Sequence, residues 1–482
     1  MNYLDIFNLI KKTIERDFKE NLRLSIFNSI SQILDLKIQT IRNYRNIFVV
    51  SVGKASLTMY NTLIDILKTY NIHTTRDIVI YDSSINNLDI LNTNKSNVEF
   101  IGSTHPYVNQ NSFVAAKKVI DLIIQNDDIN SLFLFLISGG SSAMIEDSVI
   151  PYMTLSEIYK MLLNLNINIY ELNKVRTFLS TIKGGKILQY FSESKIMSFI
   201  ISDVPFNDID TIGSGLTTHY KRISYSEIEK MISFLSNNLK VIIDAKLLLN
   251  VINKNKEIDK IMEAKEEYLK NNLENFVLLD NFKAVYMLFK KLLENFNLDK
   301  NLKLNDLKIE IAFSHLDLDI YSLCNLLKSF VFTKLNEVKQ YINEGNTKSR
   351  VDIYLFGGET FLNVLKQGYG GRIQHLALIF VKELYTILKQ INIDNLKEIL
   401  FVALATDGKD GNTNNAGVIL PIMELIKSDT EIINKLEKYI SNFNSGVFFD
   451  NPKNKRYVIK FPYGLINLNE IYMLVFIFNP II

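Results

Sequence analysis

Residues 132–142 read LFLFLISGGSS, in which an unbroken apolar run ends at two glycines framed by serines. Apolar runs of this length that end at glycine are typical of strands buried on both faces, as in a parallel sheet. The pattern recurs at residues 47–50, 198–201, 353–356 and 400–404. Helical periodicity separates these runs over residues 113–124, 155–163, 170–190 and 376–390. This alternation predicts an α/β fold of the doubly wound type.

Glycine is scarce, which makes its distribution informative. The chain holds 19 glycines in 482 residues, and residues 216–344 hold none. Most glycines lie in short clusters that follow the apolar runs, where a side chain would clash with a turn or a ligand. In open α/β sheets ligands bind at the carboxyl ends of the strands, so we expect the functional site at these clusters.

The glycine-free stretch also divides the chain. Strong strand signals fall before residue 220 and after residue 350, with weaker ones at 276–279 and 308–313. We expect two α/β domains: an N-terminal Rossmann-like domain with a doubly wound parallel sheet over residues 1–245, and a C-terminal α/β domain over residues 246–482. With glycine-rich loops in both, the active site is expected in the cleft between them.

Composition excludes several classes of protein. The 54 basic and 52 acidic residues leave a net charge of +2, which gives no bulk attraction to nucleic acid or to an anionic membrane. The single cysteine, Cys324, rules out a disulfide framework. No apolar run reaches the ~18 residues of a membrane span. The N-terminal segment lacks the layout of a signal peptide, so we expect a cytoplasmic protein.

Basic residues and small polar residues follow the predicted N-terminal strands. Lys54 follows Gly53 at the start of a predicted helix, where its ammonium suits phosphate, although a solvated lysine fits equally. The loop from Ser138 through Gly139, Gly140 and Ser141 to Ser142 can converge backbone N–H groups on an anion; a plain tight turn is the alternative. The loop is therefore a candidate phosphate site.

The helix predicted over residues 170–190 contains further candidates. Its polar positions at spacings of 3, 4 and 3 share one face, which an ordinary amphipathic helix would also produce. Two glycines, Gly184 and Gly185, then stand between Lys183 and Lys186, and this combination favours an anion site. The polar positions are Asn173, Arg176, Ser180 and Lys183.

Acidic residues also follow strand ends. Asp203 ends the run at 198–201, and Asp407 and Asp410 follow the run at 400–404. Aspartate in such positions serves as a magnesium ligand or general base, or else caps the next helix. Glu359 adds an acid after Gly358, and Arg372 follows a glycine run, where it suits bidentate capture of carboxylate or phosphate.

Other chemistries find little support. The histidines show no metal-ligand spacing, no Gly-x-Ser-x-Gly elbow is present, and Gly213-Ser214-Gly215 lacks the third glycine of a dinucleotide fingerprint. For His105, which precedes a proline, we favour a structural role. Cations, acids and glycine–serine loops without a covalent nucleophile indicate phosphoryl transfer from a magnesium nucleotide.

Nine motifs between about residues 48 and 420 occur in an order that resembles the glycerate 2-kinase family, whose C-terminal region is called MOFRL. These are Val52-Gly53-Lys54-Ala55, His105-Pro106, Ser138 to Ala143, Asn173-x-x-Arg176 leading to Ser180-x-x-Lys183-Gly184-Gly185-Lys186, Ser202-Asp203-Val204-Pro205, Ile212-Gly213-Ser214-Gly215, Gly357-Gly358-Glu359-Thr360, Gly368-x-Gly370-Gly371-Arg372-x-Gln374 and Thr406-Asp407-Gly408-x-Asp410-Gly411-x-Thr413. The MOFRL region would cover about residues 350–475.

The resemblance implies ATP-dependent phosphorylation of D-glycerate at its 2-hydroxyl, giving 2-phosphoglycerate and ADP, with Mg²⁺. By carry-over, Lys54, Arg372 and Asp203 would be catalytic. Phosphate would bind at Ser138, Gly139, Gly140, Ser141, Ser142, Lys183, Gly184 and Gly185. Glycerate would bind at Arg176, Glu359 and Asp407, and magnesium at Asp203, Asp407 and Asp410. We expect ATP and D-glycerate as small-molecule partners, and no nucleic acid or membrane partner. A homodimer is left open.

The chain departs from the family pattern at several positions, which keeps two alternatives open. Phe206 and Asn207 replace a Gly-Asp pair, and Ile373 and His375 replace an amide and an acid around Gln374. A Gly-Pro-Thr-Gly-Thr-Asn stretch survives only as residues 462–467. One alternative is a catalytically impaired homologue that binds a ligand or partner. The second is an NAD(P)H-dependent hydroxypyruvate reductase, which family members have also been called.

Overall fold

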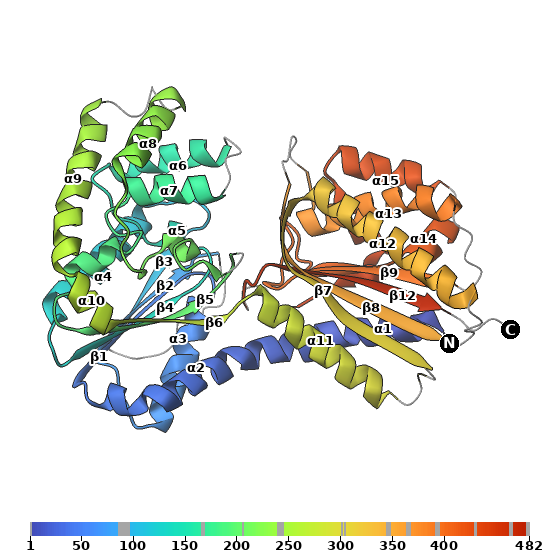
Figure 1. Ribbon diagram of the computed structural model, residues 1–482, viewed down its shortest axis with the longest axis horizontal. Helices are drawn as coiled ribbons and strands as arrows, with labels where there is room; N and C mark the ends of the chain where they lie inside the picture. The colour runs from blue at the N-terminus through green and yellow to red at the C-terminus, as the bar shows by residue number, and fades with distance from the viewer. Residues whose placement is uncertain are drawn as a thin grey trace. The chain divides into compact units, whose positions relative to one another are not determined.

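The chain forms two compact units in the computed structural model (Figure 1). The central unit comprises Ser25–Leu279, and the terminal unit combines Met1–Leu24 with Asp280–Ile482. The structure describes residues 2–84, 97–164, 169–204, 207–238, 245–299, 302, 305–343, 349–362, 368–390, 396–428, 431–461 and 466–478.

The central unit is built on a parallel sheet, in which six strands are described in the order β3-β2-β1-β4-β5-β6. They are β1 (Asn46–Val52), β2 (Arg76–Asp82), β3 (Val98–Ser103), β4 (Ser131–Ile137), β5 (Lys195–Ile201) and β6 (Leu273–Leu279). Every residue of β4 is buried, as its apolar sequence predicts, and helices cover both faces of the sheet (Figure 1). The expected doubly wound parallel sheet is confirmed.

The helices of the central unit connect these strands. They are the C-terminal part of α2 (Lys19–Arg42), then α3 (Ser56–Thr69), α4 (Gln110–Asn126), the short α5 (Ser141–Met144), α6 (Tyr152–Asn164), α7 (Ile169–Leu179), α8 (Tyr225–Asn238), α9 (Ala245–Ala264) and α10 (Glu266–Asn272). Short 3₁₀ turns occur at Lys186–Tyr190 and Ile212–Ser214.

The terminal unit has a mixed sheet with the described strand order β11-β10-β9-β12-β8-β7. Its strands are β7 (Asp306–Asp319), β8 (Arg350–Phe361), β9 (Leu396–Ala405), β10 (Gly417–Pro421), β11 (Val458–Ile459) and β12 (Glu470–Phe478). Of the described pairs, β7 and β8 run parallel and the others antiparallel. The buried strands predicted at 353–356 and 400–404 are present, but antiparallel β12 lies between them, so the implied parallel pairing is wrong here.

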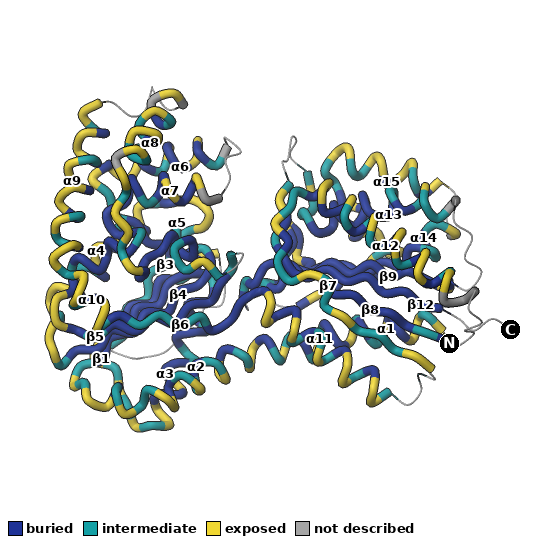
Figure 2. Tube along the Cα trace, in the orientation of Figure 1, coloured by how far each residue is buried: buried dark blue, intermediate teal, exposed yellow. Residues whose placement is uncertain are grey.

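Helices flank this mixed sheet and give the terminal unit its α/β character (Figure 1). They are α1 (Tyr3–Lys12), followed by a π-helical turn (Thr13–Phe18), then α11 (Asn281–Leu298), α12 (Ile320–Asn343), α13 (Arg372–Gln390), α14 (Ile422–Ser428), α15 (Ile432–Ser441) and α16 (Ser445–Asp450), with a 3₁₀ turn at Lys455–Tyr457. The two sheets form the buried cores of their units (Figure 2).

The division between the units differs from the expected boundary near residue 245. It falls between Leu279 and Asp280 because β6 pairs with β5 and completes the first sheet. The first 24 residues also group with the terminal unit. There Asn295 Nδ2 donates to Thr13 Oγ1 and to Asp17 Oδ2, each at 2.8 Å. The N-terminal segment is therefore part of the second domain rather than of the first.

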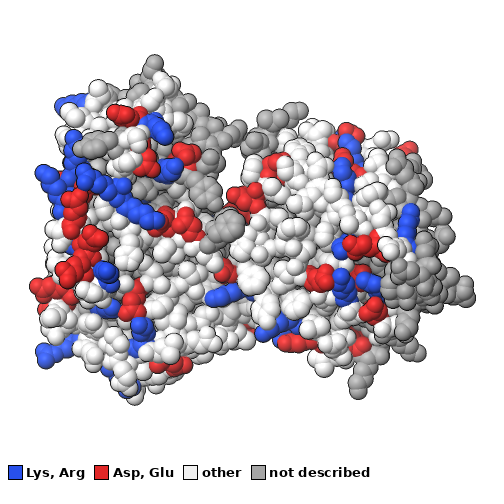
Figure 3. Space-filling view, in the orientation of Figure 1, with Lys and Arg blue, Asp and Glu red and all other residues white. Residues whose placement is uncertain are grey.

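Surface charge follows the balanced composition. On the face drawn in Figure 3, lysine and arginine side chains are interspersed with aspartate and glutamate over each unit. Within the described ranges, no helix is both long and apolar enough to cross a membrane.

Candidate active site

The loops after β1 and β4 lie side by side at the carboxyl edge of the central sheet. β1 and β4 are neighbours with Val52 opposite Ile137, although β2 and β3 come between them in sequence. The chain thus reverses its direction across the sheet at this pair. Such a topological switch point is where open α/β sheets bind ligands.

Close backbone contacts join the two loops. The amide of Lys54 donates to Gly139 O at 2.9 Å, and the amide of Ala55 donates to Ser138 Oγ at 3.1 Å. Gly53 has φ +120°, and a Cβ there would lie 2.3 Å from Ser138 Oγ, so another residue would force the loops apart. Glycine at this position therefore holds Lys54 against the serine loop.

Asp203, which follows β5, reaches the same loop. A Cβ on Gly139 would lie 2.0 Å from Asp203 Oδ2, so the carboxylate rests directly against the glycine backbone. Gly140 in turn faces the Lys54 side chain, whose Cγ would lie 3.2 Å from an added Cβ. Three strand ends therefore bring together the predicted residues Lys54, Gly139, Gly140 and Asp203.

His105 also belongs to this cluster, which the sequence analysis did not anticipate. Its Cδ2 would lie 3.1 Å from a Cβ on Gly140. The protein packed around the ring, together with the charges of Lys54 and Arg176, lowers the pKa of His105 to about 3. The imidazole is therefore neutral at physiological pH, and the shared effect of the two cations indicates that both lie near it.

The remaining serines of the loop contact α7 through the turn at Ile212–Ser214. Ser214 Oγ lies 3.0 Å from Ser142 Oγ and 3.2 Å from Asn173 Oδ1, within hydrogen-bonding distance of both. Ser141 Oγ is buried and has no hydrogen-bond partner among the described residues. The predicted Ser141 and Ser142 thus lie in one cluster with Asn173.

Lys183, Gly184 and Gly185 have a structural role here, which argues against the predicted phosphate site. α7 ends at Leu179, so Lys183 is not on a helix face, and its fully buried ammonium pairs with Glu146. The amides of Gly184 and Gly185 donate to Ser214 O and Gly215 O at 2.8 and 2.7 Å. Two lysines around two glycines also suit a buried turn, so phosphate binding by these residues stays a prediction.

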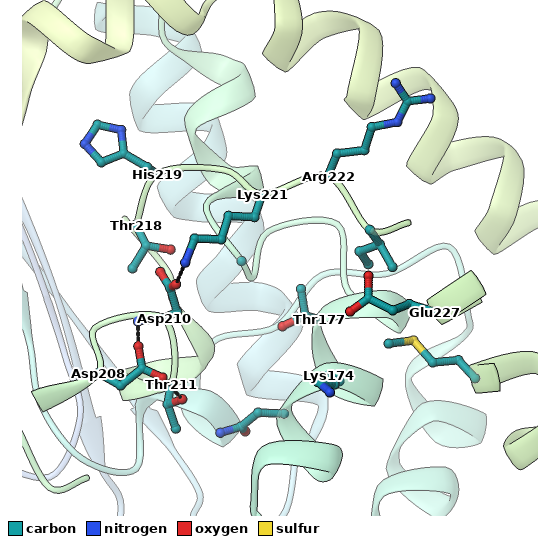
Figure 4. Close-up of a pocket in the computed structure, with 14 residues that line it drawn as sticks. Lys174, Thr177, Asp208, Asp210, Thr211, Thr218, His219, Lys221, Arg222 and Glu227 are labelled. Carbon is teal, nitrogen blue, oxygen red and sulfur yellow. Dashed lines mark hydrogen bonds and ion pairs between the residues drawn. The ribbon is translucent and has the colours of Figure 1, made fainter. Parts of the chain in front are cut away.

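A pocket of about 280 Å³ borders this cluster, shares Asn173 with it and is also lined by Gly184. In Figure 4, Lys221 reaches toward Asp210, with which it forms an ion pair, while Arg222 extends away. Arg222 is paired with Glu263 at 2.8 Å. Because these cations already have acidic partners, the pocket is a weaker anion site than the loops beside it.

In the terminal unit, Arg372 begins α13 and is held by two acids. Its Nε donates to Glu470 Oε1 at 2.6 Å, and its Nη2 donates to Glu359 Oε1 at 3.2 Å. Burial alone would lower the pKa of Arg372, but Glu470 and Glu359 outweigh it and raise that pKa. Glu470, which the sequence analysis missed, begins β12, a strand without a glycine cluster to mark it.

Asp410 is engaged with the start of α13 rather than open to a metal ion. The amides of Ile373 and Gln374 donate to its carboxylate at 3.1 and 2.8 Å, while burial raises its pKa to about 7. A Cβ on Gly371 would lie 2.0 Å from Asp410 Oδ1. This geometry supports the alternative in which Asp410 caps a helix. It gives no support to Asp410 as a metal ligand.

The predicted magnesium set is not assembled within one unit. Asp203 belongs to the central unit, whereas Asp407 and Asp410 belong to the terminal unit. Asp407 accepts the amide of Lys409 at 3.1 Å. Among the residues that the structure describes, no group of three or more His, Cys, Asp or Glu side chains could hold a metal ion.

Known proteins resemble the chain along most of its length. Glycerate 2-kinase of Sulfurisphaera tokodaii is 30% identical over 427 residues, covering 88% of this chain and 89% of that protein. The chain belongs to the glycerate 2-kinase family. Two family models match it, a domain of unknown function (DUF4147) over residues 7–240 and the MOFRL family over residues 352–469.

A solved structure extends the similarity to the fold. The crystal structure of glycerate kinase from Thermotoga maritima covers 97% of this chain and 99% of its own, with a TM-score of 0.68 at 20% identity. A putative hydroxypyruvate reductase from Agrobacterium vitis is 36% identical over 123 residues, but covers only 25% of this chain. The expected glycerate 2-kinase resemblance and the expected kinase class are thus confirmed, whereas the reductase likeness is partial.

Some departures from the glycerate 2-kinase pattern can be located. Ile373 and His375 are buried in the first turn of α13, where neither displaces Arg372 from its acids. Phe206 and residues 462–465 lie outside the described residues. Asn207 is described and has φ +57°.

Proposed function

We propose that this protein transfers the γ-phosphoryl group of ATP to the 2-hydroxyl of D-glycerate, forming 2-phosphoglycerate and ADP. The observation that carries the proposal is the cluster at the switch point of the central sheet. There a lysine, a glycine–serine loop and an aspartate meet from three neighbouring strand ends. Family membership supports the choice of hydroxy acid.

The chemistry of phosphoryl transfer fits these side chains. The 2-hydroxyl oxygen bonds to the γ-phosphorus, the bond from that phosphorus to the β–γ bridging oxygen breaks, and ADP leaves. Catalysis of this step is mainly positioning and charge stabilisation. We assign Lys54 to the charge that develops on the transferred group, the Ser138 to Ser142 loop to the phosphates, and Asp203 to the hydroxyl proton.

Magnesium fits the same cluster as part of a nucleotide complex. Mg²⁺ usually binds one or two carboxylates together with substrate phosphates, so a three-acid cluster is not required. Asp203 lies against the backbone of the proposed phosphate loop and is the acid we assign to the metal. When bound, Mg²⁺ would neutralise phosphate charge. Asp407 remains a candidate in the terminal unit, and Asp410 is occupied at α13.

Arg372 and Glu359 keep a proposed role in the reaction. The positive charge of Arg372, however, is already balanced by acids. Two carboxylates surround one guanidinium, so the group carries no free positive charge for a substrate anion. A ligand at Arg372 would have to compete with Glu470 or Glu359. We therefore propose that Arg372 positions the carboxylates of Glu470 and Glu359 toward substrate hydroxyls. Glycerate carries such hydroxyls.

A coupled assay tests the proposed reaction. Purified protein is mixed with MgATP and D-glycerate, and product is followed through enolase, pyruvate kinase and lactate dehydrogenase. Because phosphoglycerate mutase is left out, 3-phosphoglycerate gives no signal and the position of transfer is read directly. NADH oxidation in this assay that depends on D-glycerate and ATP supports the proposal.

Parallel reactions separate the alternatives. Hydroxypyruvate with NADH, without nucleotide, tests a reductase, and its turnover in the absence of kinase activity would replace the proposal. Silence in both assays from folded protein would instead identify an impaired homologue. Omitting Mg²⁺ and adding chelator tests the metal when 2-phosphoglycerate is measured directly in a stopped reaction, because the coupling enzymes themselves need Mg²⁺. Product that still forms would remove the metal from the mechanism.

A further inference from the structure

Arg176 on α7 is a buried cation that forms no ion pair with any residue that the structure describes. The residue is only 8% exposed, and its Nε is buried with no hydrogen-bond partner among the described residues. Within the described part of the chain, its one hydrogen bond joins Nη1 to Asn173 Oδ1 at 3.5 Å, the outer limit for such a bond. The guanidinium therefore has most of its donor capacity unused.

Glu146, the acid whose charge acts on Arg176, is already occupied. Glu146 is fully buried and pairs with Lys183, and it also accepts from Ser180 Oγ at 2.5 Å and Tyr159 Oη at 3.0 Å. One carboxylate thus serves two buried cations, Lys183 and Arg176, and a positive charge is left over. Tyr159 fixes the second cation, because its ring lies 5.8 Å from the Arg176 guanidinium carbon.

Such a charge is costly unless something binds it. An unpaired ion in a protein interior costs several kcal/mol, and arginine cannot escape by losing its proton at physiological pH. Desolvation lowers the pKa of Arg176, which is the expected sign of an uncompensated cation. A bound oxyanion would supply both the missing charge and the missing acceptors. Arg372, with its two carboxylates, lacks this need.

Arg176 also lies near the cluster that Lys54 and His105 form with the serine loop. Its charge acts on His105 together with that of Lys54, and Asn173 connects it through Ser214 to Ser142. Ser141 Oγ is a second buried polar atom without a hydrogen-bond partner in the described part of the chain. Ser141 thus lies in the proposed phosphate loop, and Arg176 lies on the helix that Asn173 and Ser214 connect to that loop.

We propose that Arg176 is the oxyanion receptor of the central unit and makes the site selective for acidic substrates. The inference rests on the proposed function, which supplies two oxyanions, the carboxylate of the hydroxy acid and the phosphates of the nucleotide. Glu146, Lys183 and Tyr159 act as positioning residues that hold the guanidinium without neutralising it. Neutral polyols such as glycerol, which lack the carboxylate, would bind poorly if the hydroxy acid is the occupant.

Equilibrium binding to the full-length protein tests the proposal without turnover. Isothermal titration with D-glycerate, inorganic phosphate and ADP compares the wild type with Arg176→Gln and Arg176→Lys. Loss of a buried ionic partner costs ~2–5 kcal/mol. We therefore expect at least one of the probes to bind Arg176→Gln roughly 30-fold more weakly than the wild type, or weaker still, with partial rescue by Arg176→Lys. Loss of D-glycerate alone identifies the carboxylate, and loss of phosphate and ADP identifies the nucleotide. Lys160→Gln, an exposed cation on α6, is the matched control.

Melting temperature adds a readout that a purely structural arginine would not give. Removing an unpaired buried charge should leave the ligand-free Arg176→Gln protein at least as stable as the wild type, while stabilisation by the bound anion is lost. Unchanged binding of all three probes would overturn the proposal, and so would a variant that melts well below the wild type. If the wild type binds D-glycerate through Arg176 yet forms no 2-phosphoglycerate, the receptor stands and the kinase proposal fails.

Discussion

His375 is a buried imidazole whose two nitrogens have no hydrogen-bond partner among the described residues. Its ring stacks on Phe443 at 5.1 Å with an angle of 6° between the planes. Burial lowers the pKa of His375 from 6.5 to about 4. As pH falls below 6.5, the unfolded chain takes up a proton that the folded chain resists, so folding stability is lost between pH 6.5 and 4.

His375→Phe should remove this acid sensitivity while keeping the stack on Phe443. Between pH 7.5 and 4.5 we expect the wild type to lose about 2 to 3 kcal/mol more unfolding free energy than the variant. Urea titrations at the two pH values measure the difference. His73→Gln, at an exposed position, provides the control for the loss of a histidine side chain. Equal losses in wild type and His375→Phe would contradict the assignment.

Lys54 is the residue on which the proposed chemistry depends most directly. Lys54→Ala should lower kcat for 2-phosphoglycerate formation by about 10²- to 10³-fold, the usual effect of removing one group that stabilises charge in a transition state. The melting temperature should change little. Lys68→Ala, at the exposed far end of α3, is the matched control and should retain full activity. A near-normal rate for Lys54→Ala would remove this lysine from the site.

At the scale of single elements, the start of α13 depends on Asp410. The carboxylate accepts the amides of Ile373 and Gln374 and leaves little capacity for a metal ion. Asp410→Ala should therefore destabilise the protein by about 1–2 kcal/mol, the usual cost of a lost helix cap, and Asp410→Asn by less. Thermal unfolding measures this effect.

The same variants distinguish a helix cap from a metal ligand. For a cap, the Mg²⁺ concentration that gives half-maximal activity of Asp410→Asn should match that of the wild type. A requirement for much higher Mg²⁺, without a change in stability, would return Asp410 to the metal site.

The sequence predicted elements well where glycine and apolar runs coincided. The strands that contain residues 47–50, 132–137 and 198–201 were identified because buried parallel strands leave an unambiguous apolar run. β12 was overlooked because no glycine follows it, although its own residues are strongly apolar. The helix predicted over 170–190 ends at Leu179, and Gly184 and Gly185 beyond it adopt positive φ, which no helix continues.

Candidate residues were predictable where local chemistry decided their position. Lys54 and Asp203 lie where strand ends must lie in a parallel sheet. The role of Lys183 was not predictable, because it depends on Glu146, a partner 37 residues away in a loop without a motif. Burial and pairing are properties of the packed chain, so spacing alone could not separate a phosphate-binding lysine from an internal one.

At the scale of the whole molecule, the first 24 residues belong to a domain whose other residues begin at Asp280. Ile10, Ile14 and Phe18 are fully buried there, and Lys11 Nζ donates to Arg456 O at 2.7 Å. Sequence patterns describe neighbours along the chain, so no pattern in this segment could reveal partners hundreds of residues away. This is why the expected division into 1–245 and 246–482 differs from the observed one.

Ile14→Ala tests this assignment. A large-to-small substitution at a fully buried position costs about 2–5 kcal/mol. We expect amide hydrogen exchange to accelerate in β8, β9 and β12 of the terminal unit, with little change in β1 and β4 of the central unit. Leu24→Ala, at a half-exposed position, is the control. Faster exchange confined to the central sheet would contradict the grouping.

The discontinuous terminal unit has a consequence for biosynthesis. The ribosome releases residues 1–24 before any of the chain with which they pack, and all of Ser25–Leu279 is made in between. At ~5–20 residues per second, this interval is on the order of tens of seconds. The central unit can complete its sheet in that time, while the helical segment of residues 1–24 waits for its partners to emerge.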